Sequence, residues 1–256
     1  MKRSSGVLMP IFSLPSAYGI GTLGKAAYEF ADFLQAAGQS YWQILPLGPT
    51  GYGDSPYQSF STYAGNPYFI DPQLLVQSGF LAEKDLALVT WEINAEKIDY
   101  GGLYQKHKLL LHQAYKRSKA ATNQKLAKYC HKEAAWLDDY AFFMAIKQHF
   151  AMQELASWPK EIRIRQVAAM EYYRKLLVDE VGFEKFVQFL FAEQWSALKT
   201  YVNSLGIKII GDLPIYVAID SADVWQEPSA FQLDKELLPI EVAGVPPDAF
   251  SRTGQL

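Results

Sequence analysis

Two apolar segments on either side of an amphipathic helix constrain the fold of this chain more than any other feature. Residues 6–14 and 40–46 are short and apolar, which is typical of buried parallel strands. Between them, apolar residues recur at helical spacing from Gly24 onward, and Gly38 stands where the C-terminal cap of a helix belongs. Residues 6–46 are therefore predicted to form one βαβ unit.

The loop that follows this unit, residues 48–67, is rich in aromatic side chains. Its glycines and prolines leave no helical or alternating pattern. The aromatic residues are Tyr52, Tyr57, Phe60 and Tyr63, and they stand among small polar residues. This mixture suits a flat polar ligand such as a sugar, and the carboxyl end of a parallel strand is where α/β proteins bind ligands. A surface loop that packs its rings into its own turns is the alternative.

A long middle segment, residues 71–206, shows several helical patterns and no convincing parallel strand. We expect helices over residues 102–121, 134–150 and 183–205, and the second of these is apolar around most of its circumference, which predicts burial between other helices. The clearest strand of the chain then follows at 207–217. Its acid, Asp212, lies near the carboxyl end, where a substrate-binding role is favoured over a capping role.

The fold class predicted from these elements is α/β, of the (β/α)8 barrel type with large helical insertions. A complete barrel needs eight strands, so the three found here are expected to be only its first part. One incomplete domain would then divide into residues 1–70, with the βαβ unit and its loop, 71–206, with the helical insertion and a return helix, and 207–256, with the third strand and a loop-like remainder. Such an open portion exposes edges and apolar faces, so we expect association unless something covers them.

Composition narrows the classes of partner and compartment. The 256 residues carry a net charge of −3, so no basic field favours nucleic acid. No apolar run approaches the ~20 residues of a membrane span. The single cysteine, Cys130, cannot form an internal disulfide, which favours a reducing, cytoplasmic setting.

Motifs for cofactors and metals are weak in this chain. Residues 19–24 match G-x-G-x-x-G between a strand and a helix, but the acid expected after the second strand is missing, so a dinucleotide-dependent enzyme is a lower-ranked alternative. The four histidines show no recognisable zinc spacing, and we expect neither cofactor nor metal. Cys130 lacks an identifiable orienting partner for a nucleophile. Asp138 and Asp139, adjacent on a helix, are interpreted as structural.

Six segments together resemble one enzyme family. They are residues 13–24, 41–58, 65–67, 136–140, 211–216 and 244–248. The chain resembles, over nearly its whole length, the 4-α-glucanotransferases known as amylomaltases or disproportionating enzymes. The resemblance implies a (β/α)8 barrel with helical insertions and an enzyme that cuts an α-1,4-glucan and passes the piece to another glucan. It also implies that the glycine motif is a family loop rather than a nucleotide site.

The resemblance assigns roles to individual residues. Tyr57 would stack on the sugar at the cleavage site, with Ser55 nearby, and Asp212 would hydrogen-bond hydroxyls of that sugar. Tyr52 and Tyr100 match secondary glucan contacts of the family. These residues make α-1,4-glucans and maltooligosaccharides the expected partners.

The acceptor side and the catalytic groups are implied in the same way. Asp248 and Gln255 match a flexible loop that covers the acceptor and excludes water, and Arg252 stands where some relatives have an acid. Retention of the α-linkage needs two carboxyl groups ~5 Å apart, which the resemblance places beyond Leu256. The isolated chain is therefore expected to be inactive; a non-catalytic glucan-binding or scaffold protein is the alternative of another class.

Overall fold

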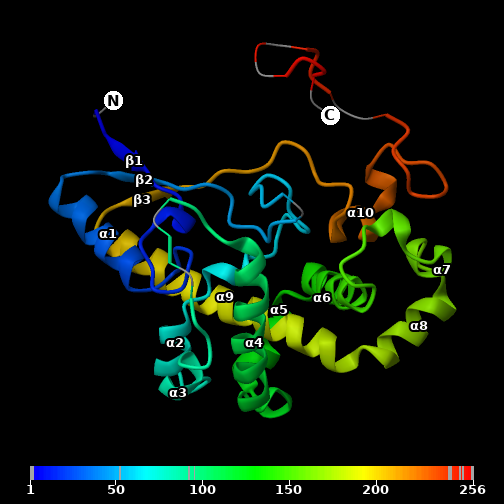
Figure 1. The fold of residues 1–256 in the computed structure, drawn as a ribbon, viewed down its shortest axis with the longest axis horizontal. Coiled ribbons are helices and arrows are strands. Elements are labelled where there is room, and N and C mark those ends of the chain that lie inside the picture. The colour runs from blue at the N-terminus through cyan, green and yellow to red at the C-terminus, as the bar shows by residue number, and fades with distance from the viewer. Residues whose placement is uncertain are drawn as a thin grey trace.

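The computed structural model shows a small parallel sheet on a larger helical body (Figure 1). It describes residues 3–51, 53–91, 93–94, 96–241, 244–247, 249 and 251–254. The strands are β1 (Gly6–Leu8), β2 (Tyr41–Gln43) and β3 (Lys208–Ile210), in the order β1-β2-β3. In this register Trp42 lies beside both Val7 and Ile209. The predicted βαβ unit is therefore present, and the chain returns to the same sheet after the helical segment.

All three strands are shorter than the sequence predicts. A 3-10 turn occupies Ile11–Ser13 inside the first predicted strand, and the predicted strand at 207–217 ends at Ile210. A proline follows each observed strand, at Pro10, Pro46 and Pro214. Proline has no N–H to donate to a ladder, and the chain continues from each strand into a loop.

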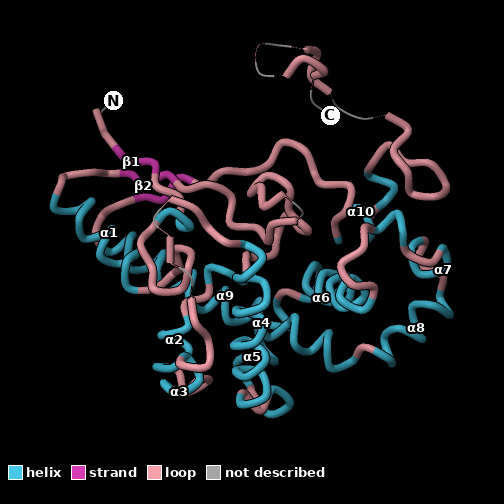
Figure 2. The backbone as a smooth tube through the Cα atoms, in the orientation of Figure 1, coloured by secondary structure: helices cyan, strands magenta, loops and turns pink. Residues whose placement is uncertain are grey.

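Two helices cover one face of the sheet. In Figures 1 and 2, α1 (Lys25–Ala36) and the C-terminal part of α9 (Val178–Ser204) lie beneath the strands. Both helices end before a glycine with positive φ, Gly38 and Gly206, as the sequence predicts. Trp42 is fully buried at this interface and its indole N–H donates to the Met9 carbonyl oxygen at 2.8 Å. One hydrophobic core therefore lies between the sheet and these helices.

The remaining helices divide between two hydrophobic cores, one shared with the sheet and one around Phe143 and Trp225. They are α2 (Pro72–Gln77), α3 (Glu83–Leu86), α4 (Tyr100–Arg117), α5 (Gln124–Lys132), α6 (Ala134–His149), α7 (Lys160–Arg163), α8 (Val167–Leu176) and α10 (Ala222–Gln226). Helix α6 packs against α5, α9 and α10, which confirms its predicted burial. The predicted loop-like remainder is wrong at α10, because Ser221 caps that helix through Val224 N–H and Trp225 is fully buried.

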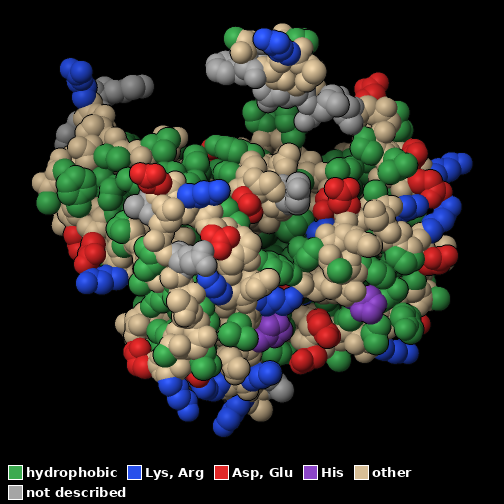
Figure 3. Space-filling view, in the orientation of Figure 1, with side chains coloured by type: hydrophobic (Ala, Val, Ile, Leu, Met, Phe, Trp, Pro, Cys, Tyr) green, Lys and Arg blue, Asp and Glu red, His purple; other side chains and the backbone are tan. Residues whose placement is uncertain are grey.

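The surface has no dominant charge on the face that Figure 3 shows, where acidic and basic side chains are interspersed. Across the described ranges, no helix combines the length and the apolar character needed to cross a bilayer.

Candidate functional site

Tyr57 and Asp212 meet at the carboxyl edge of the sheet. Tyr57 lies in the loop after β2 and Asp212 lies two residues after β3, and the Tyr57 hydroxyl donates to Asp212 Oδ2 at 2.7 Å. Because β2 and β3 are parallel neighbours, the segments that follow them leave the sheet at the same edge. This hydrogen bond, followed by partial burial and the charge of Asp212, raises the pKa of the Tyr57 phenol above its ordinary value. The phenol is therefore the donor and Asp212 the acceptor at neutral pH.

The pair opens into a cleft of about 760 Å³. Ser55 also lines this cleft, and its Oγ accepts from Tyr57 N–H at 3.3 Å. The other walls come from residues 212–219 and from the segment 231–241, which contributes Gln232 and Glu241. An exposed phenol ring, a carboxylate and amide groups around one opening suit a ligand that combines flat apolar faces with hydroxyl groups. The cleft thus brings together three of the predicted site residues, Ser55, Tyr57 and Asp212.

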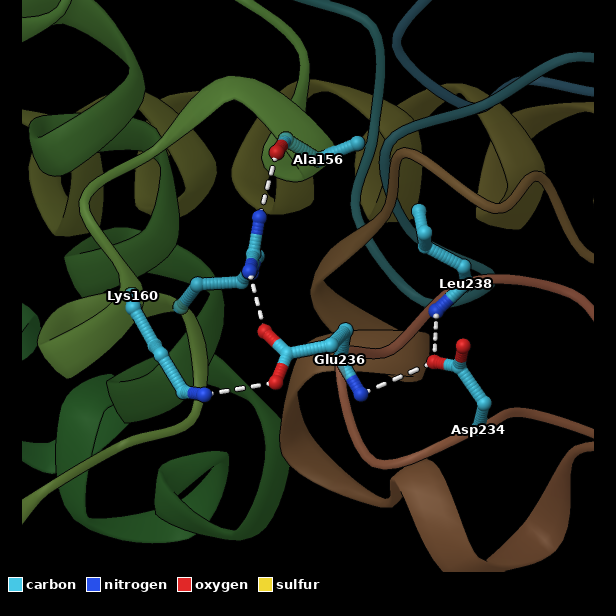
Figure 4. A network of polar contacts seen from close by, with 6 residues as sticks. Ala156, Lys160, Asp234, Glu236 and Leu238 are labelled. Carbon is cyan, nitrogen blue, oxygen red and sulfur yellow. Dashed lines mark hydrogen bonds and ion pairs between the residues drawn. The ribbon is translucent and has the colours of Figure 1, made fainter.

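One wall of the cleft includes a hairpin, residues 232–240. A polar network holds this hairpin against α7 (Figure 4). The Glu236 carboxylate accepts from Lys160 Nζ at 2.6 Å and from Arg163 at 2.8 Å. Inside the hairpin, Asp234 Oδ1 accepts the backbone N–H of Glu236 and of Leu238. The hydrogen bond from Lys160 is the main cause that lowers the pKa of Glu236. The hairpin is therefore fastened by its turn to the helical body.

Tyr100, another predicted site residue, is not among the residues that line this cleft. Tyr100 begins α4 and packs against Tyr68, with ring centroids 6.2 Å apart. Burial, and then the charge of Asp54, raises the pKa of the Tyr100 phenol. Tyr52, Asp248 and Gln255 lie outside the residues that the structure describes.

The sequence did not predict two contributors to the cleft. Tyr216 lines it from the segment after Asp212, and Gln232 lines it from the hairpin. The signal was weak in both cases, because the first segment reads as a strand and the second as an ordinary polar turn. Only the Asp234 side chain, an acid that commonly closes such turns, hints at a fixed hairpin.

The glycine motif is a buried structural turn. Thr22 Oγ1 donates to Asp71 Oδ2 at 2.6 Å, and a Cβ on Gly24 would lie 1.9 Å from the same oxygen. A carboxylate therefore occupies the N-terminus of α1, where a pyrophosphate would have to bind. This arrangement contradicts the dinucleotide alternative.

The remaining candidates have structural partners. Asp138 pairs with Lys185 at 2.6 Å and Asp139 with Arg165 at 2.7 Å, which agrees with a structural role for both acids. Burial raises the pKa of the Cys130 thiol, which disfavours a thiolate nucleophile. Within the described part of the chain, no group of three or more His, Cys, Asp or Glu side chains could hold a metal ion.

Comparison with known proteins decides the family. The family model described as 4-alpha-glucanotransferase matches residues 9–256. The chain belongs to the 4-alpha-glucanotransferase family. It is 50% identical to a 4-alpha-glucanotransferase of Clostridium butyricum, over 97% of this chain and 51% of that protein. It is 46% identical to one of Thermus thermophilus, over 100% of this chain and 51% of that protein. The chain thus spans about half the length of these curated relatives.

Solved structures agree with the family and the fold. An amylomaltase from Streptococcus agalactiae, determined in complex with acarbose, superposes with a TM-score of 0.95 at 45% identity, over 100% of this chain and 52% of that one. An amylomaltase from Corynebacterium glutamicum, at 20% identity and a TM-score of 0.75, shares the fold over 98% of this chain and 35% of that one. The predicted fold class, part of a (β/α)8 barrel with helical insertions, is confirmed.

Proposed function

We propose that this chain provides the donor-side binding surface of a 4-α-glucanotransferase, an enzyme that transfers a segment of an α-1,4-glucan to another glucan by retaining double displacement. The observation that carries the proposal is the Tyr57–Asp212 pair in an open cleft at the carboxyl edge of the sheet, in a chain of this family. Maltooligosaccharides are the proposed ligands, since the cleft offers both a ring to stack on and groups to hydrogen-bond.

Each residue of the pair has a separate proposed role. The Tyr57 ring is 44% exposed, so its face is free to stack on a sugar while its hydroxyl is held by Asp212. A carboxylate offers about four lone-pair positions, so Asp212 can accept from Tyr57 and still accept from sugar hydroxyls. Ser55 fixes the backbone of the turn that presents the ring.

The further assignments stay proposals. Tyr52 and Tyr100 are proposed as secondary glucan contacts, and Asp248 and Gln255 as part of a loop over the acceptor that excludes water. We assign binding, not bond cleavage, to residues 1–256, and place the nucleophile and the acid/base elsewhere in the protein. The division into 1–70, 71–206 and 207–256 is likewise proposed, as is a cytoplasmic location, which the single cysteine favours.

The test is maltotriose disproportionation, scored as glucose and longer oligosaccharides, in the protein at the length of its curated relatives. Asp212→Asn is expected to lower kcat/KM by about 10- to 100-fold, because it weakens a charge-assisted hydrogen bond to substrate. Tyr63→Phe is the matched control, since Tyr63 lies in the same loop but stacks on Trp136 with ring centroids 6.1 Å apart. Its kinetics should match those of the wild type.

Two results would contradict the proposal. Disproportionation by the 256-residue chain alone would place a nucleophile within it, with Asp212 the first suspect. Absence of transfer at full length, with maltoheptaose binding still seen by calorimetry, would favour the glucan-binding alternative.

A further inference from the structure

Lys147 is a buried lysine at the joint between the two loops of the cleft. Its side chain is 1% exposed, although it stands in the apolar helix α6. The ammonium donates to Asp220 Oδ2 at 2.6 Å and to the Gln153 carbonyl oxygen at 3.0 Å. It also lies over the Phe60 ring, 4.9 Å from the centroid. The ammonium thus has two hydrogen-bond acceptors and an aromatic ring as neighbours.

These contacts come from both loops that carry the site. Phe60 belongs to the loop with Tyr57, and Asp220 to the segment that continues from Asp212. The second carboxylate oxygen of Asp220 accepts Leu155 N–H at 3.0 Å, which ties this segment to the chain beyond α6. Lys147 therefore contacts both loops from one position on α6.

Direct bonds between the loops lie around the same point. Ala222 N–H donates to the Phe60 carbonyl oxygen at 2.8 Å. Thr62 donates to Asp223 through its backbone N–H at 3.0 Å and its hydroxyl at 2.7 Å. These bonds define one register between the loops, and the Phe60 ring that Lys147 contacts belongs to a residue that makes one of them.

The turn after α6 supplies one of the two hydrogen-bond acceptors of Lys147. Ala151 and Met152 both have positive φ, 51° and 62°, which is uncommon for residues with a side chain. The turn directs the Gln153 carbonyl oxygen toward both Lys147 Nζ and the Trp158 indole N–H. Burying an ammonium seldom adds net stability over an apolar side chain of similar size. Its role is therefore better sought in the unique placement of the loops.

We propose that Lys147 is a positioning residue that sets the placement of the loop at 48–67 against the segment at 211–221, and through them the geometry of Tyr57 and Asp212. It touches neither the pair nor the cleft. Its effect on catalysis rests on the proposed function, but its effect on the Tyr57–Asp212 hydrogen bond does not.

The test compares variants that separate placement from folding. Lys147→Met removes the tether but leaves Asp220 unpaired, so the main variant is Lys147→Met/Asp220→Asn, in which no charge is stranded and the acceptor for Leu155 remains. Lys185→Met is the matched control, since Lys185 forms an ion pair of the same 2.6 Å length, with Asp138, that touches neither loop.

The first readout is the pKa of Tyr57, measured by an NMR titration of labelled tyrosine. The Tyr57 signal is assigned from its absence in Tyr57→Phe. Its hydrogen bond to Asp212 raises the pKa of Tyr57, so the double variant should shift that pKa back toward the ordinary value, while Lys185→Met leaves it unchanged. Amide exchange at Thr62 and Ala222 should become faster in the double variant alone.

The second readout is kinetic, on the protein at the length of its relatives. A displacement of the loops should lower kcat/KM for maltotriose by about tenfold or more in the double variant, and not in the control. An unchanged Tyr57 pKa with unchanged loop exchange would overturn the inference. A wild type without glucan activity would defeat the proposed function, while the Tyr57 titration would still decide the role of Lys147.

Discussion

Glu184 is a buried acid on α9. It lines a cavity of about 100 Å³ between α4, α6 and α9, and its side chain is 7% exposed. Burial raises the pKa of its carboxyl from 4.5 to about 7, and the charge of Lys108 opposes this rise only in part. The folded protein therefore keeps a proton that the unfolded chain loses between pH 4.5 and 7. Stability should fall as pH rises through this window and be constant above it.

Glu184→Gln should remove this dependence, because the amide keeps the shape of the protonated acid. Relative to the wild type, the variant should gain roughly 2–3 kcal/mol in free energy of unfolding between pH 5 and pH 8. Urea unfolding at the two pH values measures the gain. Glu193→Gln, on the exposed side of the same helix, is the control and should show no such gain. Equal pH slopes for Glu184→Gln and the wild type would contradict the prediction.

The placement of a single residue was predictable where a polar side chain directly follows a recognisable strand. Asp212 follows an apolar strand, so its placement at the carboxyl edge could be predicted from sequence. Lys147 could not, because its partners Asp220 and Phe60 are distant in the chain and a lysine in a helix usually faces solvent. The sequence holds a hint, since a helix that is apolar around its circumference leaves a lysine no solvent-facing side.

At the scale of elements, the hairpin at 232–240 depends on Glu236 for its attachment to α7 (Figure 4). Glu236→Gln should weaken both ion pairs and so raise amide exchange within the hairpin severalfold, most clearly at Ile240, whose N–H donates to the Gln232 carbonyl oxygen. Because these side chains are partly exposed, added salt should reproduce part of the effect in the wild type. Hydrogen exchange followed by mass spectrometry measures both.

The control for this prediction is Glu29→Gln, which removes an exposed ion pair with Lys25 on α1. Hairpin exchange should not respond to it. Hairpin exchange unchanged in Glu236→Gln would show that the Asp234 turn alone holds this wall of the cleft.

Elements were predictable to different degrees for physical reasons. Helices α1 and α9 follow the apolar period and the glycine caps, and α6 follows its apolar composition, so the existence of all three was predicted and only their ends differ. The lengths of the strands were not predicted, because an apolar run does not say how much of it pairs with a neighbouring strand. Helix α10 was missed because it is held by Ser221 and by packing on distant α6.

At the scale of the whole molecule, the described residues cover one face of the sheet and leave the other face open. Leu8 and Ile210 are about half exposed on the strands, and the segment after β3 exposes Leu213 at 81% and Ile215 at 90%. The sequence predicted exposed edges and faces from the small number of strands, and these exposures agree with it. Which residues of the loop would be exposed was not predictable, since the pattern there reads as a strand.

Exposed apolar side chains beside an open sheet edge should make the 256-residue chain associate with itself. The free energy gained on association grows with the apolar surface removed from water, so the most exposed apolar residues should contribute most to it. Sedimentation velocity should therefore show weight-average mass rising with concentration for the wild type, and Leu213→Ser/Ile215→Ser should weaken that rise. Leu88→Ser, which replaces a leucine 65% exposed next to α3, should leave it unchanged. A wild-type chain that sediments as a compact monomer at every concentration would contradict the prediction. The short length of the edge strands β1 and β3 would then be enough to prevent association through them.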